Sequence, residues 1–226
     1  MKTAIIIPAF NEEKTITKVI NSVKKFGTPI VICDGSNDAT YLKANKSGVY
    51  VIKHKRNLGY DQSIKTGINF ILKKKFDYAL TFDADNEVNA NLLKLFQKKI
   101  STRKYSLILG TRDIIPRFSE KFFCLYTKIF YKVPDILSGV KAYSIDLCRK
   151  NKKIFKEKTI NTGLAMEVLR KKEKYCMIPI KIKFRRHNPR LGNMTINLRI
   201  FKTMFKEIIK DMKVLLKKIF KINTQN

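Results

Sequence analysis

Short apolar runs alternate with longer amphipathic segments through the N-terminal half of the chain, and this alternation constrains the fold more than any other feature. The apolar runs are rich in β-branched and aromatic residues and comprise residues 3–7, 29–33, 49–52, 78–82 and 105–109. The segments between them have helical period, at residues 13–26, 38–46, 61–74 and 89–101. Strands that alternate with helices predict an α/β protein with a mostly parallel sheet covered by helices on both faces.

This alternation ends near residue 115. Beyond it, we expect a basic aromatic helix over residues 118–132, strands over residues 137–145 and 175–184, and a helical tail from Ile196. A chain of 226 residues holds one substantial α/β domain, alone or with a tail, but not two full domains.

The chain is strongly basic, with 48 Lys and Arg against 18 Asp and Glu and a net charge of +30. Its 44% apolar and 11% aromatic residues are those of a folded protein, so the charge lies on a globular surface. That charge predicts attraction to polyanions, whether nucleic acid, an anionic membrane or phosphorylated substrates. Composition does not choose among these three.

Cysteine spacing and hydropathy constrain the cellular location. The cysteines at positions 33, 124, 148 and 176 lack C-x-x-C spacing, which favours reduced, packed thiols in a cytosolic compartment and argues against a zinc site. The apolar run at residues 4–7 is too short for a signal-peptide core, and no apolar run reaches the length of about 18 residues that a membrane-spanning helix needs. Any membrane contact is therefore expected to be peripheral.

Polar and mostly acidic loops follow the five predicted strands. In an open α/β sheet, ligands bind beyond the carboxyl ends of the strands, so a site is expected in these loops. They read P-A-F-N-E-E (8–13), D-G-S-N-D-A-T (34–40), K-R-N-L-G-Y (55–60), D-A-D-N-E (83–87) and G-T-R-D (110–113). Four of the five contain carboxylates, which predicts an acidic site at one edge of the sheet in an otherwise basic protein.

The most acidic loop contains Asp83, Asp85 and Glu87, whose alternation projects all three carboxylates to the same side of an extended chain. Like charges this close raise one another's pKa unless a cation lies among them. Hard divalent ions such as Mg²⁺ bind carboxylate oxygens and share their other positions with substrate phosphates, which predicts a metal that bridges a diphosphate to the protein. The alternative is a helix N-terminus, where acidic residues are favoured and Asn89 could cap the following helix.

An ordered series of motifs extends this interpretation. The series is I-I-I-P-A-F-N-E-E (5–13), D-G-S-N-D-A-T (34–40), N-L-G (57–59) followed by Gly67, D-A-D-N-E (83–87), G-T-R (110–112) and D-I-L-S-G-V-K (135–141). In this order the motifs resemble those of the family 2 glycosyltransferases over roughly residues 3–190, and most closely the dolichol-phosphate mannose and glucose synthase branch.

This resemblance implies a GT-A fold, a Rossmann-like parallel sheet flanked by helices, that binds a UDP- or GDP-sugar with Mg²⁺ or Mn²⁺ and transfers the sugar with inversion. Carried over by position, the residues that would contact the donor nucleotide are Pro8, Phe10, Asn11, Glu12, Asp34, Asp83 and Ala84. The metal would be held by Asp85 and Glu87, and catalysis would involve Asp85, Arg112 and Glu167. The phosphates or the acceptor would be contacted by Lys141, Arg185 and Arg190.

The implied GT-A domain covers residues 1–190, with a nucleotide-sugar-binding half at 1–115 and an acceptor half at 116–190. A basic amphipathic extension follows at residues 191–226.

Several positions depart from the family pattern. Cys33-Asp34 stands where two acidic residues are common, and Glu87 stands where Gln is usual. Lys141 replaces a common Arg, which keeps the charge but loses the bidentate fork. The family's G-x-S-K is absent, and Arg190 is the candidate substitute for its Lys.

Two basic aromatic segments predict contact with an anionic membrane. From Arg199 to Lys221, apolar residues keep helical period while lysines occupy the opposite side, which is typical of an interfacial helix. An ordinary surface helix packed on the core is the alternative. Residues 117–133 repeat the mixture of Phe, Tyr and Lys, and in the resembled family the corresponding region lies near the membrane and the lipid acceptor.

The resulting hypothesis is a metal-dependent inverting glycosyltransferase on the cytoplasmic face of a membrane, which transfers a sugar to a lipid-linked acceptor such as polyprenyl phosphate. The sequence does not determine whether a separate membrane protein completes the enzyme. A phosphate acceptor is already anionic and needs no base, whereas a sugar hydroxyl, as in cell-surface polysaccharide synthesis, would need Glu167 or Asp135 as its base.

A basic nucleic-acid-binding protein is the alternative from a different functional class. It is disfavoured because the recognisable loops are acidic, so no nucleic-acid partner is expected. His54 and His187 lie in basic stretches and are expected to be solvated.

Overall fold

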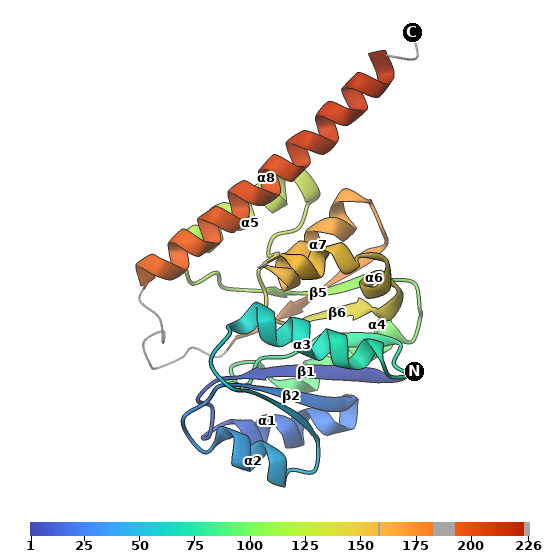
Figure 1. Ribbon diagram of the computed structural model, residues 1–226. Helices are drawn as coiled ribbons and strands as arrows, with labels where there is room; N and C mark the ends of the chain where they lie inside the picture. The colour runs from blue at the N-terminus through green and yellow to red at the C-terminus, as the bar shows by residue number, and fades with distance from the viewer. Residues whose placement is uncertain (158, 183–192, 224–226) are drawn as a thin grey trace. The chain divides into compact units, whose positions relative to one another are not determined.

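Figure 1 shows the computed structural model, which describes residues 1–157, 159–182 and 193–223. The chain divides into a sheet unit, Met1–Ile114 with Leu137–Arg185, and a helical unit, Ile115–Ile136 with Arg186–Asn226. This division differs from the predicted boundaries. The sequence predicts residues 116–136 in the same domain as the strands, whereas in the structure they group with the C-terminal segment because their helix packs along the C-terminal helix.

The sheet unit is built on seven strands: β1 (Thr3–Ala9), β2 (Thr28–Asp34), β3 (Tyr50–His54), β4 (Tyr78–Thr81), β5 (Leu107–Arg112), β6 (Lys141–Ser144) and β7 (Tyr175–Ile180). Among the described residues, these strands form one sheet in the order β3-β2-β1-β4-β6-β5-β7. β6 is antiparallel to its neighbours β4 and β5, and the remaining pairs are parallel. The predicted fold class and all five N-terminal strands are confirmed.

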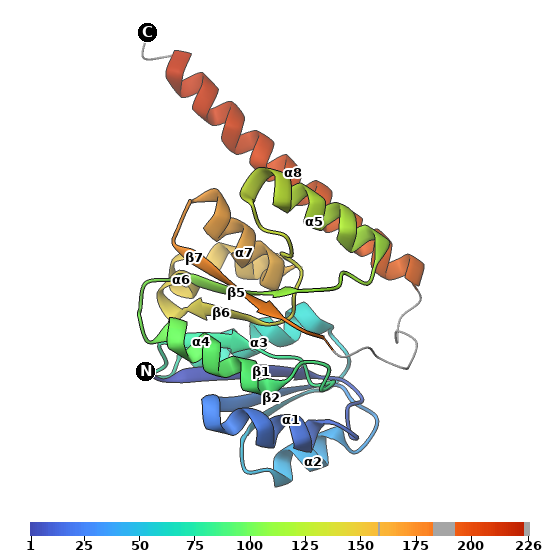
Figure 2. The same cartoon turned by 180° about the vertical axis from the view of Figure 1, so that it is seen from behind.

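Helices cover both faces of this sheet, as Figures 1 and 2 show from opposite sides. One face carries α1 (Ile16–Val23), α2 (Thr40–Lys46) and α4 (Leu93–Ile100), and the other carries α3 (Tyr60–Leu72), α6 (Ile145–Lys150) and α7 (Ile160–Arg170). Short 3₁₀ turns complete the unit at η1 (Lys24–Phe26), η2 (Ala90–Leu92) and η3 (Lys152–Lys156). The sequence does not predict α7, because that helix buries apolar residues around most of its circumference and lacks an amphipathic period.

Successive strand residues alternate between the two faces. Ile5 and Ile7 belong to the core beneath α1 and α4. Ile6 faces α3 so closely that a Cβ at Gly67 would lie 2.5 Å from the Ile6 side chain. On β6, Ala142 belongs to the α1 core, and the same alternation therefore assigns Lys141 to the α3 face.

The helical unit contains α5 (Phe118–Tyr131) and α8 (Asn193–Asn223), which pack against each other. Polar contacts join them: the Ser119 hydroxyl donates to Asn197 Oδ1 at 2.6 Å, and the Tyr126 hydroxyl donates to the Asp211 carboxylate. In the part of the chain that the structure describes, no helix has the length and hydropathy needed to cross a bilayer.

Candidate active site

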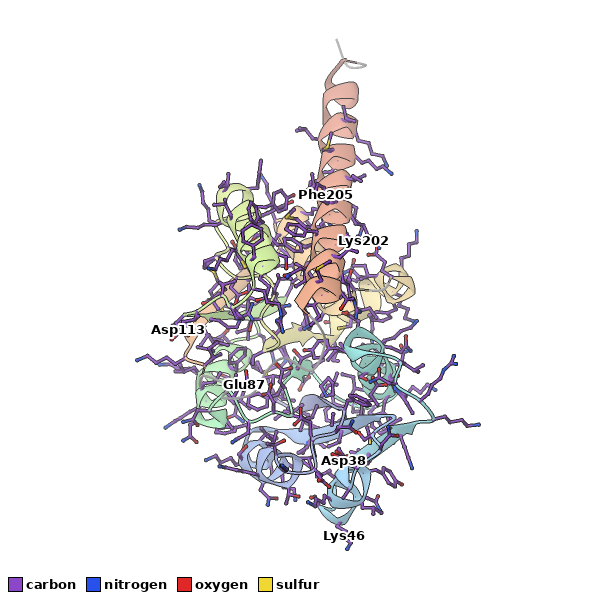
Figure 3. All side chains as sticks on the ribbon, turned by 90° about the vertical axis from the view of Figure 1, so that its left-hand side faces the viewer. Asp38, Lys46, Glu87, Asp113, Lys202 and Phe205 are labelled. Atoms are coloured by element: carbon purple, nitrogen blue, oxygen red, sulfur yellow. The ribbon has the colours of Figure 1, made fainter. Side chains whose placement is uncertain are left out.

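The loops after β1 to β5 all open on the carboxyl edge of the sheet, as predicted, because these five strands point in the same direction. Figure 3 looks towards this edge and shows Asp38, Glu87 and Asp113 on it, from the loops after β2, β4 and β5. The predicted nucleotide-binding residues Pro8 and Phe10 are partly buried at the end of β1, next to the same edge.

Hydrogen bonds join the loops that follow β1 and β2. The backbone N–H of Asn11 donates to Ser36 Oγ at 3.1 Å, and the Asn11 side chain accepts from the Asn37 N–H at 2.9 Å. Asn11 lies in the left-handed region with φ of 55°, which Asn tolerates better than most residues. The Glu12 N–H donates to Thr40 Oγ1 at 2.7 Å. Asn11 and Glu12 therefore shape the loops where a nucleotide is expected.

Asp34, at the end of β2, anchors the loop that leads into α3. Its buried carboxylate accepts from His54 Nδ1 at 2.7 Å and from the backbone N–H groups of Leu58 and Gly59 at 2.9 and 2.8 Å. The other ring nitrogen of His54 bonds Thr66 Oγ1 at 2.9 Å. The expectation of a solvated His54 is wrong, because its side chain is 9% exposed and both ring nitrogens are engaged. Asp34 thus positions a loop at the predicted nucleotide site.

Asp83 is a carboxyl group of this edge whose pKa is strongly perturbed. Burial, followed by the charge of Asp85, raises the pKa of Asp83 to about 7, although a hydrogen bond from Tyr60 and the charge of Arg112 favour the carboxylate. Its oxygens also pack against Gly139, where an added Cβ would lie 2.1 Å from Asp83 Oδ2. The charges of Asp85 and Arg112 therefore both act on Asp83 at this edge of the sheet.

The rest of this loop is a tight turn. The Glu87 N–H donates to Asp85 Oδ1 at 3.1 Å, Asn86 between them has φ of 60°, and Ala84 is buried. The Asn89 side chain caps η2 by accepting from the Asn91 N–H, which confirms the capping role considered for Asn89.

The acidic loop fits a hard divalent cation that is shared with phosphate. Within the described residues, no three His, Cys, Asp or Glu side chains are grouped to hold a metal on their own. Mg²⁺ and similar ions need only one or two protein carboxylates when phosphate oxygens and water complete their shell. The charge of Asp85 opposes ionisation of Asp83, and a cation between them would relieve that repulsion.

Lys141 is predicted to face the phosphates. It is completely buried on the α3 face of the sheet, and its Nζ donates to the Asn161 carbonyl oxygen at 3.4 Å. The Lys141 side chain is therefore not exposed in this structure, and its contact with phosphate stays a prediction. Asn161, at the start of α7, also bonds the hydroxyl groups of Tyr60 and Tyr143, and none of these three residues is among the site residues predicted from the sequence.

The two candidate bases are engaged in other interactions. Glu167 pairs with Arg170 and Lys171 of its own helix at 3.5 and 3.0 Å, about 9 Å along α7 from Asn161. Asp135 belongs to the helical unit, where it is completely buried and accepts from the Cys124 thiol at 3.7 Å. Arg185 and Arg190 lie outside the described residues, so their predicted roles stay predictions.

The parallel sheet with a polar site along its carboxyl edge defines an α/β ligand-binding protein, and comparisons with known proteins identify its family. Residues 4–157 match the family described as Glycosyl transferase family 2, and the chain belongs to that family. The solved structure of glucosyl-3-phosphoglycerate synthase from Mycobacterium tuberculosis with UDP has a TM-score of 0.73 at 17% identity, and the match covers 91% of this chain and 79% of that one. The GT-A fold is thereby confirmed.

Two archaeal relatives resemble the chain over nearly its whole length. An uncharacterized protein of Methanocaldococcus jannaschii is 29% identical over 221 residues, which cover 91% of this chain and 90% of the relative. The UDP-N-acetylglucosamine–dolichyl-phosphate N-acetylglucosaminyltransferase of Methanococcus voltae is 27% identical over 232 residues, which cover 87% and 92%.

Proposed function

We propose that the protein is an inverting glycosyltransferase that moves a sugar from a nucleoside-diphospho-sugar to a lipid-linked phosphate at a membrane surface. The observation that carries the proposal is the acidic cluster of Asp83 and Asp85 beside Arg112 at the carboxyl edge of a GT-A sheet. The M. voltae relative, named for transfer to dolichyl phosphate, supports the acceptor class.

The proposed donor site has two parts, one that contacts the nucleoside and one that contacts the diphosphate and its metal ion. The loops after β1 and β2 form the nucleotide end, where Asn11, Glu12 and Asp34 hold the backbone in place. Asp85 and Glu87 would hold a Mg²⁺ or Mn²⁺ ion, which when bound would neutralise charge on the diphosphate, and Asp83 would face the nucleotide. Arg112 adds a fixed positive charge where negative charge grows as the diphosphate departs.

Transfer to a phosphate acceptor requires no base from the protein. An oxygen of the acceptor phosphate forms a bond to the anomeric carbon as the bond from that carbon to the diphosphate oxygen breaks. The nucleoside diphosphate leaves with the electron pair, and no proton moves. The engagement of Glu167 and Asp135 in other contacts supports this base-free version.

The helical unit supports a membrane location because it exposes apolar side chains on both of its helices. On α5 these residues recur at helical spacing and are 45–65% exposed: Phe118, Phe122, Leu125 and Ile129. On α8 a second set is 51–87% exposed: Met194, Leu198, Phe205, Ile209 and Met212. The rings of Phe122 and Phe201 lie 6.0 Å apart, so the two sets adjoin where the helices meet.

The lysines of α8 lie beside this apolar stripe, and not opposite it as the sequence pattern predicts. At 100° per residue, Lys202, Lys206 and Lys213 fall on one flank of the stripe, and all three are exposed. The opposite side of the helix buries polar groups, including the carboxylate of Glu207, which pairs with Lys210 at 3.0 Å. The two helices contact each other through polar groups and expose apolar and cationic side chains. Such a surface fits the headgroup region of an anionic bilayer.

Calorimetric titration tests the donor site. UDP and GDP are each titrated into the protein with and without Mn²⁺, and into Asp85→Ala. Asp146→Ala serves as the matched control, because Asp146 is an exposed carboxylate on α6, away from the carboxyl edge. We expect metal-dependent binding of one nucleotide that is lost in Asp85→Ala alone. Absence of binding by both nucleotides would contradict the proposed donor site.

The acceptor is tested separately with the matching nucleotide-sugar. Transfer to polyprenyl phosphate, with none to the unphosphorylated polyprenol, is the expected result. Transfer to a sugar hydroxyl but not to the lipid phosphate would contradict the acceptor class while leaving the donor site intact.

A further inference from the structure

A buried polar network lies on the α3 face of the sheet, directly beneath the acidic loop. Lys141 and Tyr143 of β6 are completely buried, and Asn161 of α7 is 4% exposed. The Tyr143 hydroxyl donates to the Asn161 carbonyl oxygen at 2.5 Å, and Lys141 Nζ donates to the same oxygen at 3.4 Å. The Asn161 backbone N–H donates to Asp61 Oδ1 at 3.3 Å. This network fixes the start of α7 against β6 and α3.

Tyr60, the first residue of α3, connects the network to the acidic loop. Its hydroxyl accepts from Asn161 Nδ2 at 3.4 Å and makes a side-chain hydrogen bond to Asp83. Burial and the neighbouring acidic groups raise the pKa of Tyr60 well above its usual value, so the hydroxyl keeps its proton. A phenol has one proton to donate, and the carboxylate is a stronger acceptor than the Gly139 carbonyl oxygen 3.4 Å away.

Asp83 is therefore confined on two sides. Gly139 leaves no room for a side chain where the Asp83 oxygens pack, and Tyr60 occupies a hydrogen-bonding position of the carboxylate. Buried polar groups lower stability unless their partners are in place, so apolar residues would fill this space at lower cost if packing were the sole requirement.

We propose that Tyr60 is a positioning residue of the donor site, whose hydroxyl, held by Asn161, orients the Asp83 carboxylate towards the bound diphosphate and its cation. The inference rests on the proposed function. It assigns Tyr60 and Asn161 to donor binding and connects the start of α7 to the donor through two hydrogen bonds.

The alternative is that Tyr60 merely stabilises the fold, and Tyr143 provides the matched control. Tyr60→Phe and Tyr143→Phe each remove one hydroxyl from the same network, but the Tyr143 hydroxyl bonds the backbone and side-chain oxygens of Asn161, whereas the Tyr60 hydroxyl bonds Asp83. A purely structural network would make the two variants alike in ligand binding. A positioning role for Tyr60 would separate them.

The experiment measures the dissociation constants of UDP and GDP in the presence of Mn²⁺, together with thermal unfolding without ligand. We expect Tyr60→Phe to weaken binding of the preferred nucleotide about 10-fold, the effect of one hydrogen bond to a charged group. Tyr143→Phe should change binding by less than about 2-fold, since it leaves the Asp83 contact in place. Asn161→Ala is a second variant, which should weaken binding while the Tyr60 ring stays in place.

Unchanged binding in Tyr60→Phe, or equal losses in Tyr60→Phe and Tyr143→Phe at equal melting temperatures, would overturn the positioning role and leave the donor site standing. A wild-type protein that binds neither nucleotide would refute the donor site, and this role with it.

Discussion

Substitution of Phe205 by Gln tests the membrane surface on α8. Phe205 is 58% exposed in the apolar stripe, and full burial of a Phe side chain stabilises by roughly 1.5–3 kcal/mol. Insertion of the exposed portion into a bilayer would therefore contribute about 1–2 kcal/mol, so Phe205→Gln should weaken vesicle binding roughly 5- to 30-fold. Leu42→Gln is the control, because Leu42 is 60% exposed on α2 of the sheet unit.

Vesicle binding by two lysine variants distinguishes the effect of charge on α8 from the effect of overall net charge. Lys202 and Lys46, both labelled in Figure 3, are exposed lysines of α8 and α2, so each Lys→Gln variant lowers the net charge equally. A lysine near an anionic bilayer contributes about 1 kcal/mol, so Lys202→Gln should weaken binding about 5-fold and Lys46→Gln should not.

The assay is co-sedimentation with vesicles of anionic and of neutral lipid, at low and high salt. Binding should require anionic lipid, weaken with salt, and respond to Phe205→Gln and Lys202→Gln in preference to their controls. Equal effects of Phe205→Gln and Leu42→Gln, or equal binding to neutral vesicles, would refute the membrane surface.

Three further predictions concern the sheet unit. Gly139→Ala should abolish metal-dependent nucleotide binding in calorimetry, because its Cβ would lie 2.1 Å from Asp83 Oδ2; retained affinity would contradict the close packing. The pKa of Asp83 is raised from 3.8 to about 7, so the folded protein holds a proton that the unfolded chain releases between these values. In chelator-treated protein, the free energy of unfolding in urea should therefore fall as the pH rises from about 4 to 7, and Asp83→Asn should reduce this dependence on pH. The same pH dependence in Asp83→Asn and wild type would contradict the raised pKa of Asp83. His54→Ala should lower the free energy of unfolding by about 1–3 kcal/mol in urea titration, since Asp34 and Thr66 lose a buried partner; a loss below about 0.5 kcal/mol would show that the His54 bonds add little.

The positions of the strands and of the acidic loops could be predicted because both depend on local pattern. Runs such as 29–33 and 78–82 are buried on both faces of a parallel sheet and are therefore mostly apolar. Parallel strands bring their carboxyl ends to one edge, so strand direction places Asp83 and Arg112 on the same edge of the sheet.

The environments of individual polar residues could not be predicted in the same way. His54 stands among lysines and arginines in the sequence, yet its ring lies between Asp34 and Thr66, which are 20 and 12 residues away. Lys141 belongs to a motif associated with phosphate, yet strand alternation turns its side chain towards α7.

The sequence by itself determined the α/β class, the family resemblance and the acidic edge, because hydrophobic period and motif order are properties of neighbouring residues. Tertiary structure alone decided which polar residues meet: Tyr60, Gly139 and Asn161 converge near Asp83 from segments up to 101 residues apart. It also decided that α5 groups with α8, and that both helices keep their apolar stripes exposed. The physical reason is that burial and hydrogen bonding depend on distance in space, which local sequence pattern does not specify.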